Sequence, residues 1–298
     1  MDALLQRKMN AVISGGDTCW MKGRKSMKKL LLVALALLLV FGLVACGGGG
    51  ESAEEPPASE EGTVDPAIQA IKDAGVLRVG VKNDVPGFGL LNPETGEYEG
   101  LEIDMAHKLA GLILDDEAKV EFTAVTAETR GVLLDNGQID MVIATFTIKP
   151  DRLEQWNFSE PYYQDSVGLL VESKNGFTSF ADLDGKVIGV ASAATSKDAV
   201  QEEADNLGIK VSFSEFQTYP EISTALKAGK VDAFAVDRAI LKGYLDDARE
   251  LLPESFNPQD YGIATKKTNT GLADFVNGFV STIKADGTLE ALIDQHNL

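Results

Sequence analysis

Asp135-Asn-Gly-Gln-Ile-Asp-Met-Val-Ile-Ala144 decides the fold class of this 298-residue chain. It contains a helix end, a glycine suited to the helix C-cap, and an Asp that opens a short apolar strand. The same order recurs in Lys227-Ala-Gly-Lys-Val-Asp-Ala-Phe-Ala-Val236. A strand that is apolar at successive positions is typical of a parallel sheet covered by helices on both faces. The two stretches therefore predict two similar α/β units and no short-period solenoid repeat.

Strands and helices alternate on both sides of these stretches, which predicts the α/β fold class for the whole folded part. The predicted strands cover residues 77–81, 119–125, 139–144, 166–171, 187–190, 211–216, 231–236 and 261–265. The predicted helices cover residues 103–114, 129–136, 196–207, 221–227 and 272–292, the last broken at Asp286-Gly287.

The N-terminal part has the features of a secretory signal. An apolar run at residues 30–44 follows Lys28-Lys29 and is too short to cross a ~30 Å hydrocarbon core comfortably. Residues 1–20 do not fit a signal, so we expect the true start at Met21 or Met27 and an upstream extension before it. We interpret residues 1–45 as a signal peptide with this extension.

The run ends in Leu43-Val-Ala-Cys46, which resembles the lipobox of bacterial lipoproteins. The resemblance implies that Cys46 is acylated and anchors the protein to the outer side of the cell membrane. Residues 46–63 are rich in Gly, Pro, Ser and Glu, which predicts a flexible acidic tether. Cys19 is the one other cysteine, so we expect no disulfide in the mature protein.

The formal net charge is −19, and removal of residues 1–45 leaves −24. Such a surface disfavours nucleic acid and anionic lipid as partners. An anionic ligand must therefore be held by locally placed cations. We expect no cofactor and no metal, because the sequence has no clustered ligands at metal-binding spacing.

Several motifs resemble the family 3 extracellular solute-binding proteins from about residue 71 to the C-terminus. They are Arg78-Val-Gly-Val81, Tyr98-Glu-Gly-Leu-Glu-Ile-Asp-Met-Ala106, Asp140-Met-Val-Ile-Ala-Thr-Phe-Thr-Ile-Lys-Pro-Asp-Arg152, Phe158-Ser-Glu-Pro-Tyr-Tyr163 and Gly185-Lys-Val-Ile-Gly-Val190. Three further stretches look closest to the aspartate- and glutamate-binding members, namely Val81-Lys-Asn-Asp-Val-Pro86, Thr129-Arg-Gly131 and Phe213-Ser-Glu-Phe216 with the following Tyr219-Pro220.

This resemblance implies a two-lobed type II periplasmic-binding-protein fold with two hinge crossovers, near residues 162–166 and 256–261. The first lobe then comprises residues 64–163 and 260–298, and the second comprises residues 164–259. The implied function is capture of aspartate or glutamate between the lobes for the permease of an ABC importer, by a monomer.

Two charged residues are expected to hold the backbone groups of the ligand. Arg152 follows a strand end, where open α/β sheets bind ligands, and its planar fork suits a carboxylate; the family uses this Arg for the ligand α-carboxylate. The alternative is a surface Arg paired with Asp151 or Glu154. Asp237 also follows a strand and matches the family residue that pairs with the α-ammonium; the alternative is an N-cap for the next helix.

Hydroxyl groups complete the predicted site. Thr145 and Thr147 lie close to Arg152 in sequence, and Thr195 and Ser196 open a helix whose N-terminus attracts anions. The chain has Ala193 where the family loop usually has Gly, which leaves the conformation of that loop open.

Lys82 and Arg130 are predicted to select an acidic side chain, because each adds a cation beyond those that the α-groups need. The alternative is that both are solvated surface charges. Tyr219 either hydrogen-bonds the ligand side chain or packs in the core, and Phe88 is a candidate apolar wall of the site.

Other functions stay open as alternatives. Glutamine, histidine or cystine could replace the acidic ligand, and the fold also hosts some dehydratases. His107 is expected to face solvent and His296 lies near the chain end, so we expect no enzyme. A surface adhesin is neither supported nor opposed by the sequence, and a sensory module would need a membrane span after the lobes.

Overall fold

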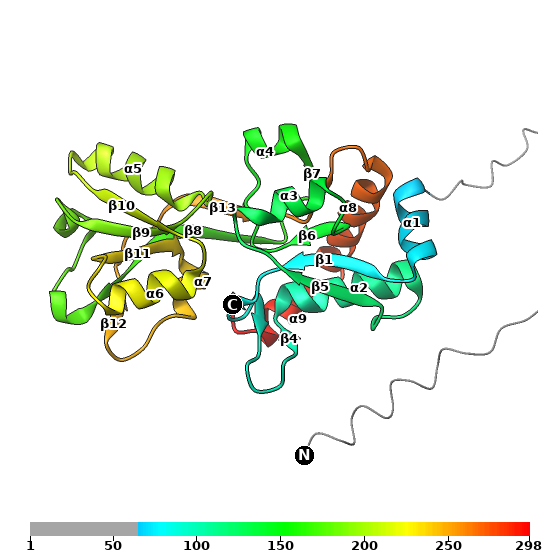
Figure 1. Ribbon diagram of the computed structural model, residues 1–298, viewed down its shortest axis with the longest axis horizontal. Coiled ribbons are helices and arrows are strands. Elements are labelled where there is room, and N and C mark those ends of the chain that lie inside the picture. The colour runs from blue at the N-terminus through cyan, green and yellow to red at the C-terminus, as the bar shows by residue number, and fades with distance from the viewer. Residues whose placement is uncertain (1–64) are drawn as a thin grey trace, which may run out of the picture. The chain divides into compact units, whose positions relative to one another are not determined.

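The computed structural model describes residues 65–298, which form two β-sheets, a small third sheet and the helices that cover them (Figure 1). The predicted signal peptide, Cys46 and the tether lie outside the described residues. The predicted α/β class and two-lobed fold are confirmed. Among residues 65–298, no helix is both long enough and apolar enough to cross a membrane.

The first lobe is built around a five-stranded sheet. Its strand order is β5 (Val120–Ala124), β1 (Leu77–Val81), β6 (Met141–Ile143), β14 (Ala264–Lys266) and β7 (Trp156–Phe158). β1 runs parallel to β5 and β6, whereas β14 is antiparallel to both of its neighbours. The carboxyl ends of β1, β5 and β6 therefore meet at one edge of this sheet.

The second lobe is built around a six-stranded sheet. Its main order is β10 (Ser212–Phe216), β9 (Val187–Ala191), β11 (Ala233–Asp237), β8 (Tyr163–Glu172) and β12 (Arg249–Leu251), and β13 (Phe256–Tyr261) also pairs with β8. β9 is parallel to β10 and β11, so their carboxyl ends also share one edge.

The long strand β8 and its antiparallel partner β13 form the two crossovers (Figure 1). They pair from Tyr163 opposite Tyr261 to Val167 opposite Phe256. The two crossovers therefore support each other through backbone hydrogen bonds. The predicted lobe boundaries, at 163/164 and 259/260, fall inside these strands and stay predictions.

Helices of both lobes cover the faces of the sheets. Those of the first lobe are α1 (Pro66–Ala74), α2 (Leu101–Leu114), α3 (Thr129–Asp135), α4 (Pro150–Gln155), α8 (Thr270–Ala285) and α9 (Thr288–Gln295). Those of the second lobe are α5 (Ser196–Leu207), α6 (Tyr219–Lys227) and α7 (Arg238–Lys242), with 3₁₀ turns at Ser173–Asn175 and Phe180–Leu183.

Two local predictions need correction. Residues 261–265 form no single strand: β13 ends at Tyr261, and the backbone N–H of Gly262 turns away to Phe146 O. Helix α6 begins two residues before the predicted start, because Thr218 and Glu221 form a capping box and Pro220 fits the first turn. The sequence prediction also missed the small antiparallel sheet of β2 (Asp84–Val85), β3 (Gly89–Leu91) and β4 (Tyr98–Glu99).

This small sheet fixes the start of α2. Gly100 adopts a φ of +129°, and a Cβ there would overlap the carbonyl of Phe88. The first N–H groups of α2 then donate to Gly87 O and Phe88 O. This arrangement directs Glu102, in the first turn of α2, into the protein interior beneath the edge where β1 and β6 end.

Candidate functional site

Arg152 lies in α4, just after the loop that follows β6, and is buried. Its Nη1 donates to Thr147 O at 2.8 Å, and its Nη2 donates to Ala193 O of the second lobe at 3.4 Å. It forms no ion pair with any side chain among residues 65–298, so the surface pairing with Asp151 or Glu154 is wrong. Burial lowers the pKa of its guanidinium. The group is a buried cation at the junction of the lobes.

Asp237 is the last residue of β11 in the second lobe and is buried. Its Oδ2 accepts a short hydrogen bond from the Tyr261 hydroxyl of β13, and its Oδ1 has no partner among the described residues. Burial raises the pKa of its carboxyl to about 7. The N-cap alternative is wrong for its side chain: Asp165 Oδ2 accepts the Ala239 N–H of α7 instead, at 2.8 Å.

Arg130 and Arg152 both lie against the ring of Phe146. The guanidinium carbons are 3.8 Å and 4.9 Å from the ring centroid, which is cation–π geometry. Arg130 is 5% exposed, so the solvated alternative is wrong for it. Its Nη1 donates to Ala144 O at 2.8 Å and Thr145 O at 3.2 Å, and its Nε is buried without a partner among the described residues. Burial, then the charge of Arg152, lowers the pKa of Arg130 to about 9.

Thr145 connects Arg130 to Glu102. It adopts a φ of +43°, which is strained for a β-branched residue. Its N–H donates to Glu102 Oε1 at 2.5 Å, its carbonyl accepts from Arg130, and its Oγ1 is buried without a partner among residues 65–298. Tyr162 Oη donates to the same Glu102 oxygen at 2.6 Å. Burial raises the pKa of Glu102 to about 7.

Thr147 and Thr195 converge on Gln259, which the sequence analysis missed. Both hydroxyls donate to Gln259 Oε1 at 2.8 Å, although Thr147 lies in the first lobe and Thr195 in the second. Gln259 belongs to β13 and its amide also donates to Asn257 O at 2.9 Å. The two hydroxyls thus bridge the lobes through one side chain and keep their oxygens as acceptors.

The loop before α5 brings Ser196 into the same region. Ala193 takes a φ of +58°, so the backbone keeps a left-handed conformation at the position where the family usually has Gly. Ser196 starts α5, and its Oγ is buried without a hydrogen-bond partner in the described part of the chain. Ala193 O meanwhile faces Arg152.

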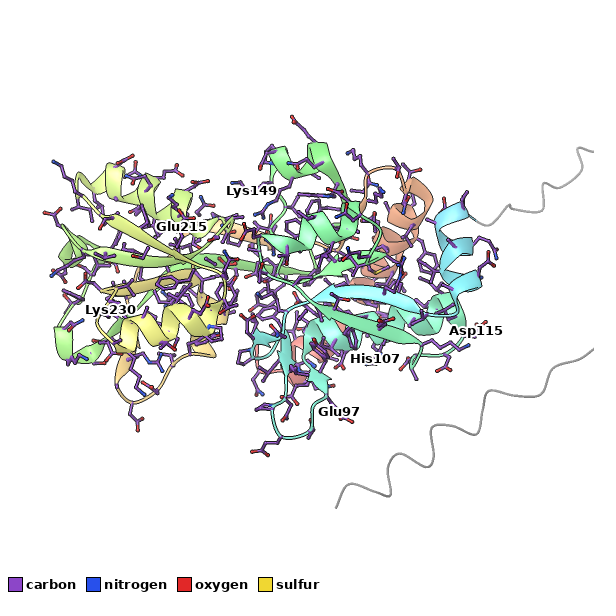
Figure 2. All side chains as sticks on the ribbon, in the orientation of Figure 1. Glu97, His107, Asp115, Lys149, Glu215 and Lys230 are labelled. Carbon is purple, nitrogen blue, oxygen red and sulfur yellow. The ribbon has the colours of Figure 1, made fainter. Side chains whose placement is uncertain are left out.

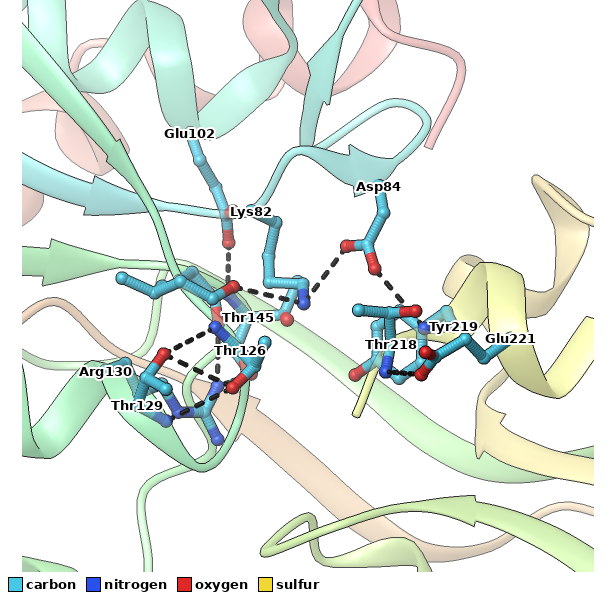
Figure 3. A network of polar contacts seen from close by, with 12 residues as sticks. Lys82, Asp84, Glu102, Thr126, Thr129, Arg130, Thr145, Thr218, Tyr219 and Glu221 are labelled. Atoms are coloured by element: carbon cyan, nitrogen blue, oxygen red, sulfur yellow. Dashed lines mark hydrogen bonds and ion pairs between the residues drawn. The ribbon is translucent and has the colours of Figure 1, made fainter. Parts of the chain in front are cut away.

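Lys82 follows β1 directly and is 3% exposed, so the solvated alternative is wrong here too. Its Nζ lies 3.0 Å from Asp84 Oδ1 and 4.6 Å from the centroid of the Tyr219 ring (Figure 3). Burial lowers the pKa of Lys82, and Asp84 partly restores it. The prediction that Lys82 is a surplus charge is corrected by its ion pair with Asp84.

Two aromatic residues of the prediction lie beside these groups. Tyr219 is buried, and its ring is 6.0 Å from that of Phe234, so it packs in the core while also covering Lys82. Phe88 is fully buried and packs edge-on against Tyr163 and Tyr261 at the crossovers. His107, expected in solvent, is half-buried, with Nδ1 2.7 Å from Glu117 O.

A pocket of about 500 Å³ reaches Arg152 from outside. Phe146 and Lys149 line it from the first lobe, and Ala193 and Glu215 line it from the second; Figure 2 labels Lys149 and Glu215 on their two lobes. A larger groove of about 920 Å³ lies between α2 and α8, and none of the site residues above lines it. We therefore place the candidate site at the junction of the lobes.

Buried polar atoms without a hydrogen-bond partner among the described residues lie at this junction. Buried polar groups nearly always have hydrogen-bond partners, and an unpaired one costs free energy. Besides Asp84 Oδ1, which forms an ion pair with Lys82 Nζ at 3.0 Å, five buried side-chain atoms of the residues just described have no hydrogen-bond partner among residues 65–298: Glu102 Oε2, Arg130 Nε, Thr145 Oγ1, Ser196 Oγ and Asp237 Oδ1. They include donors and acceptors from both lobes, so the junction suits a small polar ligand with groups of both charges.

Comparison with known proteins fits this two-lobed arrangement. The model of the bacterial extracellular solute-binding proteins, family 3, matches residues 77–298. The chain belongs to this family.

Individual relatives extend the comparison. The ABC transporter glutamine-binding protein GlnH of Bacillus subtilis (strain 168) is 37% identical over 269 residues, which cover 89% of this chain and 96% of that protein. The glutamate-binding protein GluB of Corynebacterium efficiens is 32% identical, over 78% of this chain and 82% of its own. The crystal structure of the solute receptor for L-cysteine of Neisseria gonorrhoeae has a TM-score of 0.70 and 28% identity, covering 77% of this chain and 92% of that one.

Proposed function

We propose that this chain captures an amino acid outside the cytoplasmic membrane and delivers it to the permease of an ABC importer. The family membership supports a binding protein rather than an enzyme, and the names of its relatives support an amino acid as the ligand. Arg152 has the planar fork that binds a carboxylate with two parallel hydrogen bonds. Asp237 Oδ1, from the other lobe, is free among the described residues to accept from an α-ammonium.

The ligand side chain is acidic in this proposal, aspartate or glutamate. The observation that carries it is the pair of buried guanidiniums, Arg130 and Arg152, on one Phe146 ring, neither with an ion pair among residues 65–298. An α-carboxylate neutralises Arg152 and leaves Arg130 as an uncompensated buried charge, which is expensive. A second carboxylate on the ligand removes that cost. The acidic preference therefore rests on Arg130, since Asp84 already neutralises Lys82.

Glutamine is the second candidate, and the Lys82–Asp84 ion pair favours it. This pair presents one donor and one acceptor at the side of the site where Tyr219 lies. A carboxamide has a donor and an acceptor of its own, whereas a carboxylate only accepts. Glutamine would satisfy the pair without adding charge.

Calorimetry with glutamate, aspartate, glutamine and asparagine separates the two candidates. We expect the better acidic ligand to bind at least roughly tenfold more tightly than its amide, about 1.4 kcal/mol. Equal affinity for glutamate and glutamine would reject the acidic preference but leave amino-acid capture intact. A screen of the twenty amino acids in which none raises the melting temperature would reject amino-acid capture itself, because a ligand of the folded state must raise it.

The proposal includes a lipid anchor at Cys46, which the lipobox-like Leu43-Val-Ala-Cys46 supports. Cys46→Ala expressed in a bacterial host should move the protein from the membrane fraction to the soluble extracellular fraction and abolish its labelling by fatty acid. Unchanged acylation and membrane association of the variant would reject the anchor. Neither result bears on ligand binding by the folded part.

A further inference from the structure

The ion pair between Lys82 and Asp84 is buried on both sides. The two side chains are 4% and 8% exposed, and the Nζ–Oδ1 distance is 3.0 Å. The chain bends at Asn83 between β1 and β2, and the two side chains on either side of this bend meet. Lys82 Nζ also approaches Val125 O at 3.4 Å. Asp84 is thus the charge partner that the described residues provide for Lys82.

Asp84 also contacts the second lobe. Its Oδ2 accepts from the Tyr219 N–H at 3.3 Å, at the start of α6 (Figure 3). Its backbone carbonyl accepts from Tyr244 Oη at 2.6 Å, just beyond α7. Gly243 permits this approach, because a Cβ there would lie 2.9 Å from Pro86. Asp84 of the first lobe therefore pairs with Lys82 of its own lobe and accepts hydrogen bonds from Tyr219 and Tyr244 of the second lobe.

We infer that Asp84 is a specificity-determining residue, which weakens the preference for an acidic over an amide side chain by neutralising Lys82. The inference rests on the proposed function, because it concerns the side-chain end of the same amino-acid site. Lys82 lies beside Tyr219, and the charge of Arg130 lowers the pKa of both Lys82 and Tyr219. With Asp84 ionised, the pair is neutral and Arg130 alone favours a ligand carboxylate.

The contact of Asp84 with the second lobe relates the neutralisation of Lys82 to ligand binding. The Tyr219 N–H holds the Asp84 carboxylate when the lobes are together, so the Lys82 charge is compensated in the form that encloses the ligand. An uncompensated ammonium in that low-dielectric junction would attract a ligand carboxylate more strongly than an amide. Specificity is such a difference between two affinities.

Asp84→Asn tests the inference, because Asn keeps an acceptor for the Tyr219 N–H and removes the charge. Glutamate and glutamine are titrated by calorimetry into the full chain. We expect the ratio of glutamate to glutamine affinity to rise at least roughly tenfold over that of the wild-type protein, about 1.4 kcal/mol. One control should leave the ratio within twofold: Glu97→Gln, which removes one exposed carboxylate elsewhere in the first lobe.

Lys82→Met tests the same inference from the other side of the pair. It leaves Asp84 as an uncompensated carboxylate, so the ratio should fall by at least roughly threefold. This variant decides the matter if Asp84→Asn does not fold. If the ratio of affinities changes by less than threefold, or in the opposite direction, in variants that fold, the inference about Asp84 is wrong. The proposed function is then unaffected. A wild-type protein that binds neither ligand overturns the proposed function, and this inference with it.

Discussion

Arg152 is the residue on which amino-acid capture depends most directly. Its guanidinium is buried, donates to Thr147 O and has no ion-pair partner among residues 65–298. We predict that Arg152→Ala weakens binding of the preferred amino acid by about 30- to 5,000-fold, because loss of one partner of a buried charge pair costs roughly 2–5 kcal/mol.

Calorimetry on variants with native circular-dichroism spectra measures this loss. Arg249→Ala is a suitable control, since Arg249 pairs with Asp246 at 2.7 Å on β12 and contacts none of the site residues. It should leave the affinity within twofold. A loss under about threefold in Arg152→Ala would place this side chain outside the ligand contacts.

Glu102 makes the stability of the ligand-free protein depend on pH. Its pKa is raised from 4.5 to about 7 by burial, so between these values the folded state holds a proton that the unfolded state has released. The stability that comes from this group is complete below about pH 4.5 and is lost as pH rises through about 7.

Glu102→Gln removes this titration while keeping an acceptor for Thr145 N and Tyr162 Oη. We predict that the free energy of unfolding of the variant rises relative to wild type as pH increases from 4.5 to 7.5, by an amount on the order of 2 kcal/mol. Denaturant unfolding of both proteins at several pH values gives the difference. A difference that does not vary with pH would mean that Glu102 titrates normally in the fold.

Helix α3 positions Arg130 by packing closely on the neighbouring strand β7. Gly131 follows Arg130, and a Cβ at this position would overlap the Trp156 ring. We predict that Gly131→Ala destabilises the fold by about 1–3 kcal/mol, the usual cost of overpacking, and weakens ligand binding by displacing α3.

Gly278→Ala is the matched control for this element. Gly278 also lies inside a helix, α8, but nothing is within 4 Å of a Cβ built there. This change should stabilise the protein by up to about 1 kcal/mol through helix propensity and leave affinity unchanged. Urea unfolding and calorimetry on both variants test the pair. Similar effects of the two substitutions would show that the contact of α3 with Trp156 is unimportant.

The sequence predicts elements and site residues best where one local rule is sufficient. Arg152 and Asp237 could be placed because each follows a strand, and parallel strands end at a common edge. Glu102 could have been found from helical periodicity: Met105, Ala106 and Leu109, three, four and seven residues later, put it on the apolar face of α2.

Contacts made between distant segments were beyond prediction from one sequence. Gln259 joins Thr147 and Thr195 because two crossover strands and two loops meet there, and no local pattern specifies that meeting. Asp84 shows an intermediate case. Its partner Lys82 is only two residues away in the sequence, but its contacts with Tyr219 and Tyr244 span more than 130 positions.

At the scale of the whole molecule, the two lobes share apolar contacts of one core cluster and a set of polar contacts at the candidate site. Arg152 donates to Ala193 O, Thr147 donates to Gln259, and the Tyr219 N–H and Tyr244 Oη donate to Asp84. Against them stand two buried guanidiniums that disfavour each other and several buried polar atoms without partners among residues 65–298. An amino acid that pairs with these groups removes the cost of burying them and so favours contact between the lobes.

We therefore predict that ligand closes the lobes about the crossovers β8 and β13. A ligand shifts such an equilibrium by its difference in affinity for the two forms, and here most of its partners converge when the lobes meet. Small-angle scattering should show a smaller radius of gyration at saturating ligand than without ligand. Arg152→Ala with native secondary structure should show no such change at the same ligand concentration, since the ligand then lacks its anchor. An identical profile of the wild-type protein with and without bound ligand would contradict closure, and calorimetry on the same sample establishes that the ligand is bound.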